Sequence, residues 1–231
     1  MPIQLITPPA AEPISLADVK NDMRIDIDFT DHDLMIQAYI SAGRAHAENI
    51  TRRALVSQQW RMTGDRFPSP MAGRLTEYWL GQQWGLAGMG GISSFLPTDR
   101  TGYGILLPIS PLISVDSIKY IDPAGVQQTL LSSTYKVDTV SEPARILPAF
   151  GKSWPTTRQE INSVEVTFTA GIAPTVSTQD LALIPFGIKA AIIMYCKAHY
   201  EASFDEPTSR EYERRMAAID GLLNPYRVVT F

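Results

Sequence analysis

The sequence predicts an α+β fold in which N- and C-terminal helices form a helical core, with a central β-rich excursion between them. Apolar residues recur at helical spacing near both ends of the chain, whereas apolar and polar residues alternate in its middle. Most of the seventeen prolines lie between Pro68 and Pro174, which is typical of short strands separated by turns. The length of 231 residues is enough for one large domain or two small ones.

Residues 1–14 are predicted to form an extended arm rather than a helix or a strand. Pro8, Pro9 and Pro13 fix φ and remove backbone donors, which disfavours regular hydrogen bonding. Residues 15–54 are predicted to form two helices. Ser15 can cap the first of them, and Asp18 follows three residues later at the spacing of a capping box.

The second helix is predicted from Thr30 to about Arg53. Apolar or small residues recur there at alternating spacings of four and three, which places them on one helix face. They are Ile36, Ile40, Gly43, Ala47 and Ile50. Because Gly43 and Ala47 are small, another helix can approach closely at these positions.

Residues 55–180 are predicted to form the β-rich excursion, in which side chains alternate between two faces of each strand. In the first strand, one face carries Gln58, Trp60 and Met62. In a later strand, Val164, Val166 and Phe168 alternate with Glu165, Thr167 and Thr169. Between two other alternating runs, Pro123 and Gly125 supply turn residues, so a hairpin is predicted there.

A glycine-rich insertion at about residues 69–104 interrupts the β-rich excursion. Seven of the fifteen glycines fall between Gly81 and Gly104, and the segment also carries two of the four tryptophans. Glycine loses much backbone entropy on ordering, and exposed tryptophan is unfavourable in water. The segment is therefore too flexible for a core and too apolar for a simple linker.

Residues 181–224 are predicted to return to helix, and residues 225–231 to form a C-terminal tail. The first of these helices is apolar on nearly all sides, which is typical of a central helix packed by several neighbours. The last helix carries Glu211 and Arg215 at the spacing of an i,i+4 ion pair. Pro225 ends it.

The composition is that of an ordinary globular protein and argues against a dedicated nucleic-acid binder. Hydrophobic residues make up 45% of the 231 residues, and the net charge is −4. Nucleic-acid binders are usually basic or carry a dense stripe of lysine and arginine, and the sequence has no such stripe. The single cysteine, Cys196, excludes an intrachain disulfide and favours a reducing compartment. Neither a signal peptide nor a membrane span is predicted, so the protein is expected to be cytosolic where it is made.

The aspartates between the first two helices suggest a calcium site, but their spacing does not fit one. An EF-hand loop starting at Asp26 would need glycine at its sixth position and glutamate at its twelfth, where the chain has Asp31 and Gln37. We therefore interpret Asp26, Asp28, Asp31 and Asp33 as a polar break before a helix N-terminus, where acids are favourable.

Two glycine-containing stretches resemble nucleotide-binding motifs and fail their requirements. "FGKSW" lacks the first glycine of a phosphate-binding loop, which is replaced by Ile146, and Trp154-Pro155 follows where a helix should begin. "GMGGIS" has Ser93 where the dinucleotide fingerprint needs its last glycine. No cofactor-binding residue is predicted.

Cys196 and His199 lie one turn apart on the apolar helix and could form a nucleophile–base pair. A buried thiol beside a packed imidazole is the favoured interpretation. The three histidines also lack the spacing of zinc ligands on one helix. No catalytic or metal-binding residue is predicted, and the chain is not expected to be an enzyme.

A series of segments in fixed order carries a family resemblance. They are "ISLADVKNDMRID", "DHDLMIQAYISAGRAHAENITRRALVSQQWRM", "LPISPLISVDSIKYIDPAG", "SWP", "VEVTFTAG", "IPFGIKAAIIMYCKAHYE" and "LLNPYRV". In this combination the chain resembles the head–tail connector proteins of long-tailed bacteriophages, also called adaptor or head-completion proteins. The resemblance covers about residues 13–67 and 105–228, so the whole chain would be a single connector domain.

The resemblance implies a structural virion protein of the neck, assembled in the host cytoplasm. Copies would form a ring, probably of twelve, beneath the portal protein, extending the DNA channel. The ring would present a platform for the next neck component, a stopper or tail-completion protein. DNA would pass through without sequence-specific binding, and an acidic balance suits a channel through which DNA slides. Neither a cofactor nor a membrane is implied.

The resemblance also suggests that the C-terminal tail docks on the portal. The candidate portal-binding residues are Leu223, Pro225, Tyr226, Arg227 and Phe231. Aromatic and arginine side chains are frequent interface anchors. The alternative is that the tail folds back onto its own core, and the sequence leaves both interpretations open.

The insertion departs from the family pattern, and long loops of this kind are usually functional or disordered. We expect it to order against a neighbouring subunit or another neck protein, with Tyr78, Trp79, Trp84 and Phe95 as anchors. The alternative is a small extra hairpin packed on the β-rich excursion.

Three other functions remain open at this stage. A stopper or tail-terminator role is the nearest competitor, although such proteins usually have a β-dominated core. A small hydrolase would use Cys196 and His199. A ligand-binding β module would use Trp79, Trp84 and Trp154 as stacking surfaces.

Overall fold

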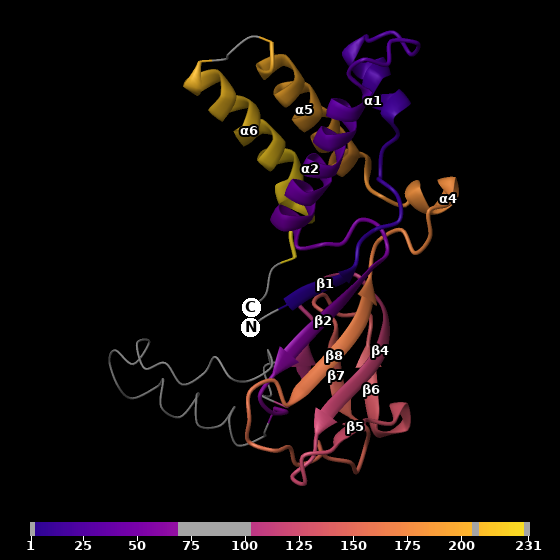
Figure 1. The fold of residues 1–231 in the computed structure, drawn as a ribbon, viewed down its shortest axis with the longest axis vertical. Helices are drawn as coiled ribbons and strands as arrows, with labels where there is room; N and C mark the ends of the chain where they lie inside the picture. Colours follow the sequence, from indigo (N-terminus) through magenta and orange to yellow (C-terminus); the bar gives the residue numbers. More distant parts are fainter. Residues whose placement is uncertain (1–2, 69–102, 205–207, 229–231) are drawn as a thin grey trace. The chain divides into compact units, whose positions relative to one another are not determined.

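The computed structural model describes residues 3–68, 103–204 and 208–228, and it confirms the predicted α+β class. The chain divides into two compact units (Figure 1). The helical unit comprises residues 9–57 and 171–231, so helices from both ends of the sequence belong to it, as predicted. The β unit comprises residues 1–8 and 58–170. The assignment of residues 1–231 to a single connector domain stays a prediction.

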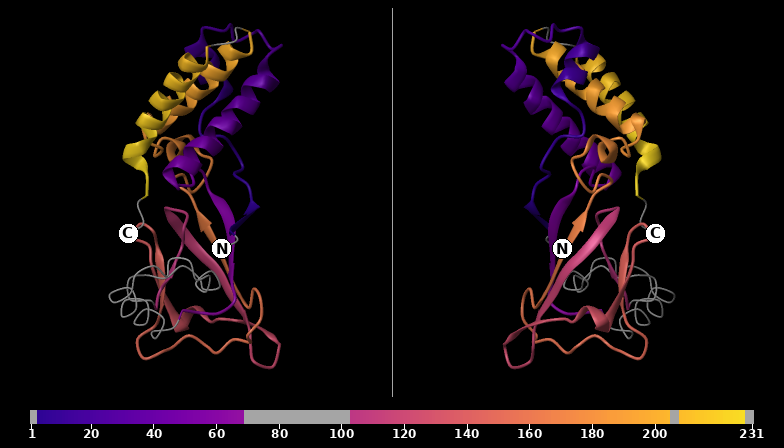
Figure 2. Two further views of the ribbon diagram at one scale, coloured as in Figure 1. Left: turned by 90° about the vertical axis from the view of Figure 1, so that its left-hand side faces the viewer. Right: turned by 90° about the vertical axis from the view of Figure 1, so that its right-hand side faces the viewer.

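The helical unit is a bundle built from sequence-distant helices. Its helices are α1 (Leu16–Met23), α2 (Asp33–Thr51), α4 (Thr178–Leu181), α5 (Phe186–Ala202) and α6 (Ser209–Leu223), and a 3₁₀ turn, η2 (Asn224–Tyr226), follows. Figure 1 and the turned views of Figure 2 show α2, α5 and α6 running side by side. The predicted apolar helix, α5, is central, because α1, α2 and α6 all pack on it.

The helix boundaries follow local capping chemistry. The Ser15 hydroxyl accepts a hydrogen bond from the Asp18 backbone N–H at 3.1 Å, which confirms the predicted cap of α1. Helix α2 begins three residues later than predicted, and its N-cap residue, His32, makes no side-chain capping bond. It ends at Thr51, where Arg52 adopts a left-handed φ of 56°.

The predicted i,i+4 ion pair within α6 is wrong. Glu211 is the third residue of a capping box, in which its carboxylate accepts a hydrogen bond from the Thr208 N–H. Arg215 instead pairs with Glu201 on α5, with 2.6 Å between Nη1 and Oε2. Because the Glu211 carboxylate caps α6, Arg215 pairs with a carboxylate of the neighbouring helix α5 instead.

Gly43 allows the close approach of α2 to α5 that its size predicts. An added Cβ would lie 3.1 Å from both Ile192 Cγ2 and Tyr195 Cδ1. The core around this crossing is apolar, with Ile36, Ile40 and Ile192 almost fully buried. The predicted inward face of α2 is therefore confirmed.

The β unit contains two antiparallel sheets. The larger has the order β1 (Ile3–Thr7), β2 (Gln58–Gly64), β8 (Val164–Ala170), β4 (Leu112–Ile121), β5 (Gln127–Thr129). The smaller has the order β3 (Ile105–Leu106), β7 (Arg145–Pro148), β6 (Tyr135–Asp138), and the 3₁₀ turn η1 (Ser132–Thr134) precedes β6. In Figure 1 the smaller sheet lies behind β8 and β4.

The N-terminal segment is extended, but the prediction that it contains no structural element is wrong. Residues Ile3–Thr7 form an edge strand that pairs with β2, with a register shift between Leu5 and Thr7. The prolines that suggested a free arm begin at Pro8, after the strand has ended. Proline excludes ladder hydrogen bonds only at its own position.

The alternation predicted for β2 and β8 is confirmed by their register. Met62 pairs with Val166 and Trp60 with Phe168, so the apolar residues of both strands share one face. Met62, Val166 and Phe168 are fully or almost fully buried. On the opposite face, Asp116 accepts hydrogen bonds from Gln59 and Thr169, at 2.9 and 2.8 Å.

The predicted hairpin connects β4 to β5. Gly125 has a φ of 87°, a conformation that favours glycine. Asp122 accepts hydrogen bonds from the backbone N–H groups of Ala124 and Val126. These bonds, that from Val126 above all, lower the pKa of Asp122 and fix the turn.

Candidate partner-binding surfaces

The start of the C-terminal tail folds back onto the helical unit. The Val228 N–H donates to the Thr51 carbonyl oxygen at 2.9 Å, and Arg53 Nε donates to the Tyr226 carbonyl oxygen at 2.8 Å. Leu223 is fully buried in the bundle core. The tail thus follows the fold-back alternative through Val228.

The Tyr226 ring packs closely against Gly187 on α5. An added Cβ at Gly187 would lie 2.7 Å from the Tyr226 hydroxyl oxygen, so only glycine leaves room for the ring. Of the predicted portal-binding residues, Pro225 and Arg227 are exposed. Phe231 lies outside the described residues.

The predicted anchors of the insertion, Tyr78, Trp79, Trp84 and Phe95, also lie outside the described residues. Pro68, which precedes the insertion, and Tyr103, near its C-terminal end, line a groove of about 690 Å³ in the β unit. Phe67 and Trp154 stack in this groove with a centroid distance of 4.9 Å and an interplanar angle of 2°. The Trp154 indole N–H donates to the Tyr103 carbonyl oxygen at 2.8 Å, so this tryptophan orders the groove.

Cys196 and His199 do not form a nucleophile–base pair. The Cys196 thiol is buried, and burial raises its pKa to about 12. His199 Nδ1 lies 2.9 Å from the Tyr195 carbonyl oxygen, and its ring stacks on Tyr195 with a centroid distance of 4.0 Å. Both Cys196 and His199 therefore serve the packing of the bundle. A thiol with so high a pKa is a poor nucleophile at neutral pH.

A buried lysine organises the loop between α1 and α2, residues 24–32. Lys20 is only 2% exposed, and its ammonium donates to the carbonyl oxygens of Ile27 and Phe29 at 3.2 and 2.8 Å. It also forms an ion pair with Asp33, with 2.5 Å between Nζ and Oδ1. The two carbonyl oxygens accept hydrogen bonds from the ammonium, and the Asp33 carboxylate supplies the opposite charge. No sequence signal marks Lys20 as a functional residue, because its role depends on contacts with residues up to thirteen positions away.

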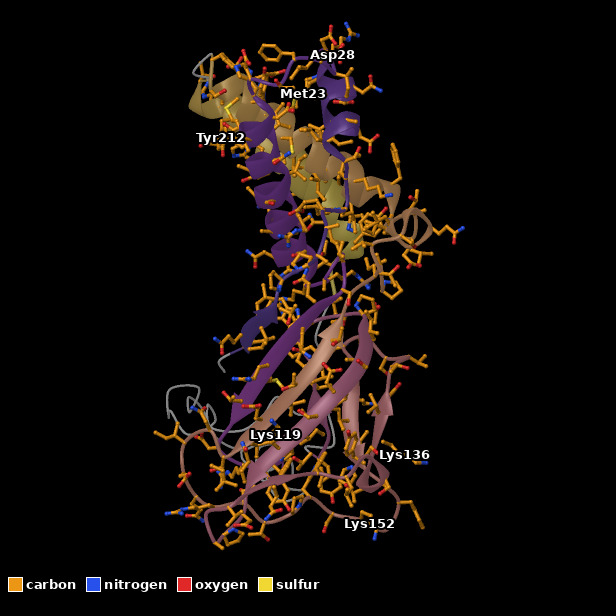
Figure 3. The ribbon with its side chains drawn as sticks, turned by 45° about the vertical axis from the view of Figure 1, so that its right-hand side comes forward. Met23, Asp28, Lys119, Lys136, Lys152 and Tyr212 are labelled. Carbon is orange, nitrogen blue, oxygen red and sulfur yellow. The ribbon has the colours of Figure 1, made fainter. Side chains whose placement is uncertain are left out.

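The same end of the helical unit exposes a group of aromatic side chains. His32 contacts Phe29 and Phe204, with centroid distances of 4.9 and 5.4 Å. His32 Nδ1 also lies 2.9 Å from the Tyr200 hydroxyl oxygen. Figure 3 shows Asp28 at the outer end of the adjoining loop.

The described ranges contain neither a cluster of metal ligands nor a membrane-spanning helix. No three His, Cys, Asp or Glu side chains converge on a possible metal position among residues 3–68, 103–204 and 208–228. Within the same part of the chain, no helix has the length and apolarity needed to cross a membrane. Of the four aspartates at the break before α2, Asp33 forms an ion pair with Lys20, and no cluster of converging ligands forms among them.

The fold is similar to that of chains in the neck of gene transfer agent (GTA) particles. One chain, from the neck of an empty GTA particle with C6 symmetry, has a TM-score of 0.67 and 20% sequence identity. Another, from the neck of a native GTA particle with C12 symmetry, has a TM-score of 0.62 and 20% identity. A third, from the virion of a native GTA particle, has a TM-score of 0.65 and 19% identity.

In all three comparisons the match covers 100% of this chain and 97% of the other. No protein-family model and no curated protein matches the sequence. At this level of identity the comparison concerns the fold alone, which this chain shares end to end with chains of GTA particles. The predicted resemblance is confirmed at the level of the fold.

Proposed function

We propose that this chain is a head–tail adaptor of a phage-like particle, a structural protein of the virion neck. The observation that carries this proposal is the end-to-end fold similarity to chains in GTA necks, which includes both units of the structure. The packed imidazole and buried thiol of α5 give no support to a hydrolase. The protein assembles in the host cytoplasm and acts as a scaffold, not as an enzyme.

The functional form is a ring beneath the portal protein. The similar chains come from assemblies with C6 and C12 symmetry, which supports a closed ring of identical copies, twelve in number. The ring extends the DNA channel and presents a platform to a stopper or tail-completion protein. The net charge of −4 supports a channel in which DNA phosphates are not held.

The exposed part of the tail anchors the ring to the portal. Leu223 and Tyr226 belong to the helical unit, so they orient the tail rather than contact the portal. Pro225 and Arg227 are exposed. In this proposal Pro225, Arg227 and residues 229–231 therefore make the portal contact, whereas Val228 packs on the bundle.

Electron microscopy of a reconstituted complex tests the adaptor role. The purified chain is mixed with the portal ring encoded beside it, because assembly can require this template. An added ring of density beneath the portal is expected. A bare portal, together with binding to a later neck or tail component, would assign the chain to a stopper or tail-terminator position instead.

Two tail variants separate anchoring from folding. Removal of residues 229–231 combined with Arg227→Glu leaves Tyr226 and the Val228 backbone in place, so the bundle should keep its stability while portal binding falls. A deletion beginning at Asn224 would also remove Tyr226 and Val228, which pack on the bundle. Wild-type portal binding by the first variant would refute the anchor.

The insertion contributes a second interface in this proposal. Its anchors are Tyr78, Trp79, Trp84 and Phe95, and it begins and ends at the groove that contains Phe67 and Trp154. Deletion of residues 72–102 is expected to weaken ring or neck assembly. Unchanged assembly would favour the alternative in which the insertion packs only on its own β unit.

A further inference from the structure

The loop between α1 and α2 lies at the surface, yet its backbone is held by a buried charged side chain, Lys20. Lys20 loses its hydration in order to bind two loop carbonyl oxygens and Asp33. Desolvation of an ammonium is unfavourable unless hydrogen bonds and an opposite charge compensate it, and here two carbonyl oxygens and the Asp33 carboxylate do so. The ammonium ties the backbone at Ile27 and Phe29, so residues 24–32 have a fixed shape.

This fixed loop displays apolar side chains to solvent. At this end of the helical unit the exposed fractions are 58% for Ile27, 38% for Phe29, 83% for Leu34 and 62% for Phe204. Phe29 and Phe204 are joined through the ring of His32. Grouped exposed apolar residues, unlike single ones, mark interaction surfaces.

Charge defines which partner fits this surface. Residues 20–33 contain five aspartates and two basic residues, so they carry most of the net charge of −4. One of the aspartates, Asp33, is neutralised by Lys20, whereas Asp26, Asp28 and Asp31 are exposed. Acidic side chains repel nucleic acid and anionic lipid. They attract a protein segment in which lysine or arginine flanks an apolar side chain.

We propose that the tip surface, formed by residues 24–34 and Phe204, is a preorganised docking site for such a basic, apolar segment of another neck protein. Lys20 acts as a positioning residue, because it holds the loop in its bound shape before the partner arrives. Binding then costs less conformational entropy than it would for a flexible loop. This inference rests on the proposed neck function and assigns a partner to a surface outside the C-terminal tail.

Binding of the full-length chain to the portal protein and to the next neck protein encoded beside it tests the proposal. The variant Phe29→Ser with Phe204→Ser removes the aromatic side chains, and at least a tenfold loss of affinity for one of the two partners is expected. The control variant Phe150→Ser with Val140→Ser removes apolar side chains that are at least as exposed, in the β unit. It should bind within twofold of wild type.

Further variants test separately the contribution of charge to binding and the role of Lys20 in holding the loop. Asp28→Lys should weaken binding more than Asp28→Asn, and the wild-type affinity should fall as salt rises. Lys20→Met should speed hydrogen exchange of the amides in residues 24–32 while the helical circular dichroism of the bundle is retained. These measurements separate the loop from the bundle.

The possible results distinguish this inference from the neck function itself. If wild type and the tip variant bind both neck proteins equally, the tip surface is refuted and the adaptor role stands. If the wild-type chain binds neither protein, both proposals fail. If the tip variant fails only in self-assembly, the occupant is a second copy of this chain, and the proposed partner is wrong.

Discussion

Gly43 lies where α2 approaches α5, and Gly43→Ala measures how tightly the two helices pack. The new methyl group would lie 3.1 Å from Ile192 Cγ2 and Tyr195 Cδ1, whereas favourable carbon–carbon contacts lie at about 3.5–4.0 Å. Tyr195 cannot move freely, because its ring is stacked on His46 at 5.3 Å and on His199 at 4.0 Å between centroids. Overpacking of a core costs about 1–3 kcal/mol.

A gain in helix propensity of about 0.8–1.0 kcal/mol partly offsets this cost. We therefore expect Gly43→Ala to lower the free energy of unfolding of the helical unit by about 1 kcal/mol. Gly221→Ala is the matched control, because an added Cβ there meets nothing within 4 Å. This exposed position in α6 should gain about 0.8–1.0 kcal/mol from propensity alone.

Urea unfolding followed by circular dichroism at a helical wavelength compares the two variants. The two substitutions should change the free energy of unfolding in opposite directions, although the chemical change is the same. If Gly43→Ala proved as stabilising as Gly221→Ala, the close contact of α2 with α5 would be refuted.

Three further outcomes are expected. The buried Cys196 thiol should react with an alkylating reagent only as fast as the protein unfolds. Because burial raises the pKa of this thiol from 9.0 to about 12, the folded state should also lose stability as the pH rises above about 9. Asp138, whose pKa is lowered to about 2 chiefly by Arg145, contributes stability above pH 4 that should be lost as the pH falls towards 2, and Asp138→Asn should remove this acid dependence in a pH titration of unfolding. Gly171→Ala should destabilise by about 1–3 kcal/mol in urea unfolding, because its Cβ would lie 2.7 Å from the Ser57 backbone nitrogen; a neutral effect would contradict this close approach.

Periodicity and local capping predicted most of the fold. The inward face of α2, the alternation of β8 and the Ser15 cap depend on residues within one element, and the structure confirms all three. The prediction failed at β1 because a strand is defined by its partner. No signal within Ile3–Thr7 distinguishes an edge strand from an extended arm.

The candidate surfaces were harder to predict because they depend on tertiary neighbours. Whether the tail folds back is decided by Gly187 on α5, which leaves space for Tyr226 thirty-nine residues later in the chain. Similarly, Arg215 has a suitable partner in its own helix, but Glu211 is used in capping, and Glu201 takes its place. Residue spacing alone does not predict which of several possible partners a side chain will choose.

Lys20 shows how burial can point to function where composition does not. A lysine near the end of a short helix would ordinarily be assigned to a solvated face, and its sequence context contains nothing unusual. The structure instead buries it and directs its ammonium at two carbonyl oxygens of an exposed loop. A bundle needs no buried charge for stability, since apolar residues of similar size often serve as well or better. The geometry is best explained if the shape of the loop itself is required, which is why Lys20→Met should affect residues 24–32 more than the bundle beneath them.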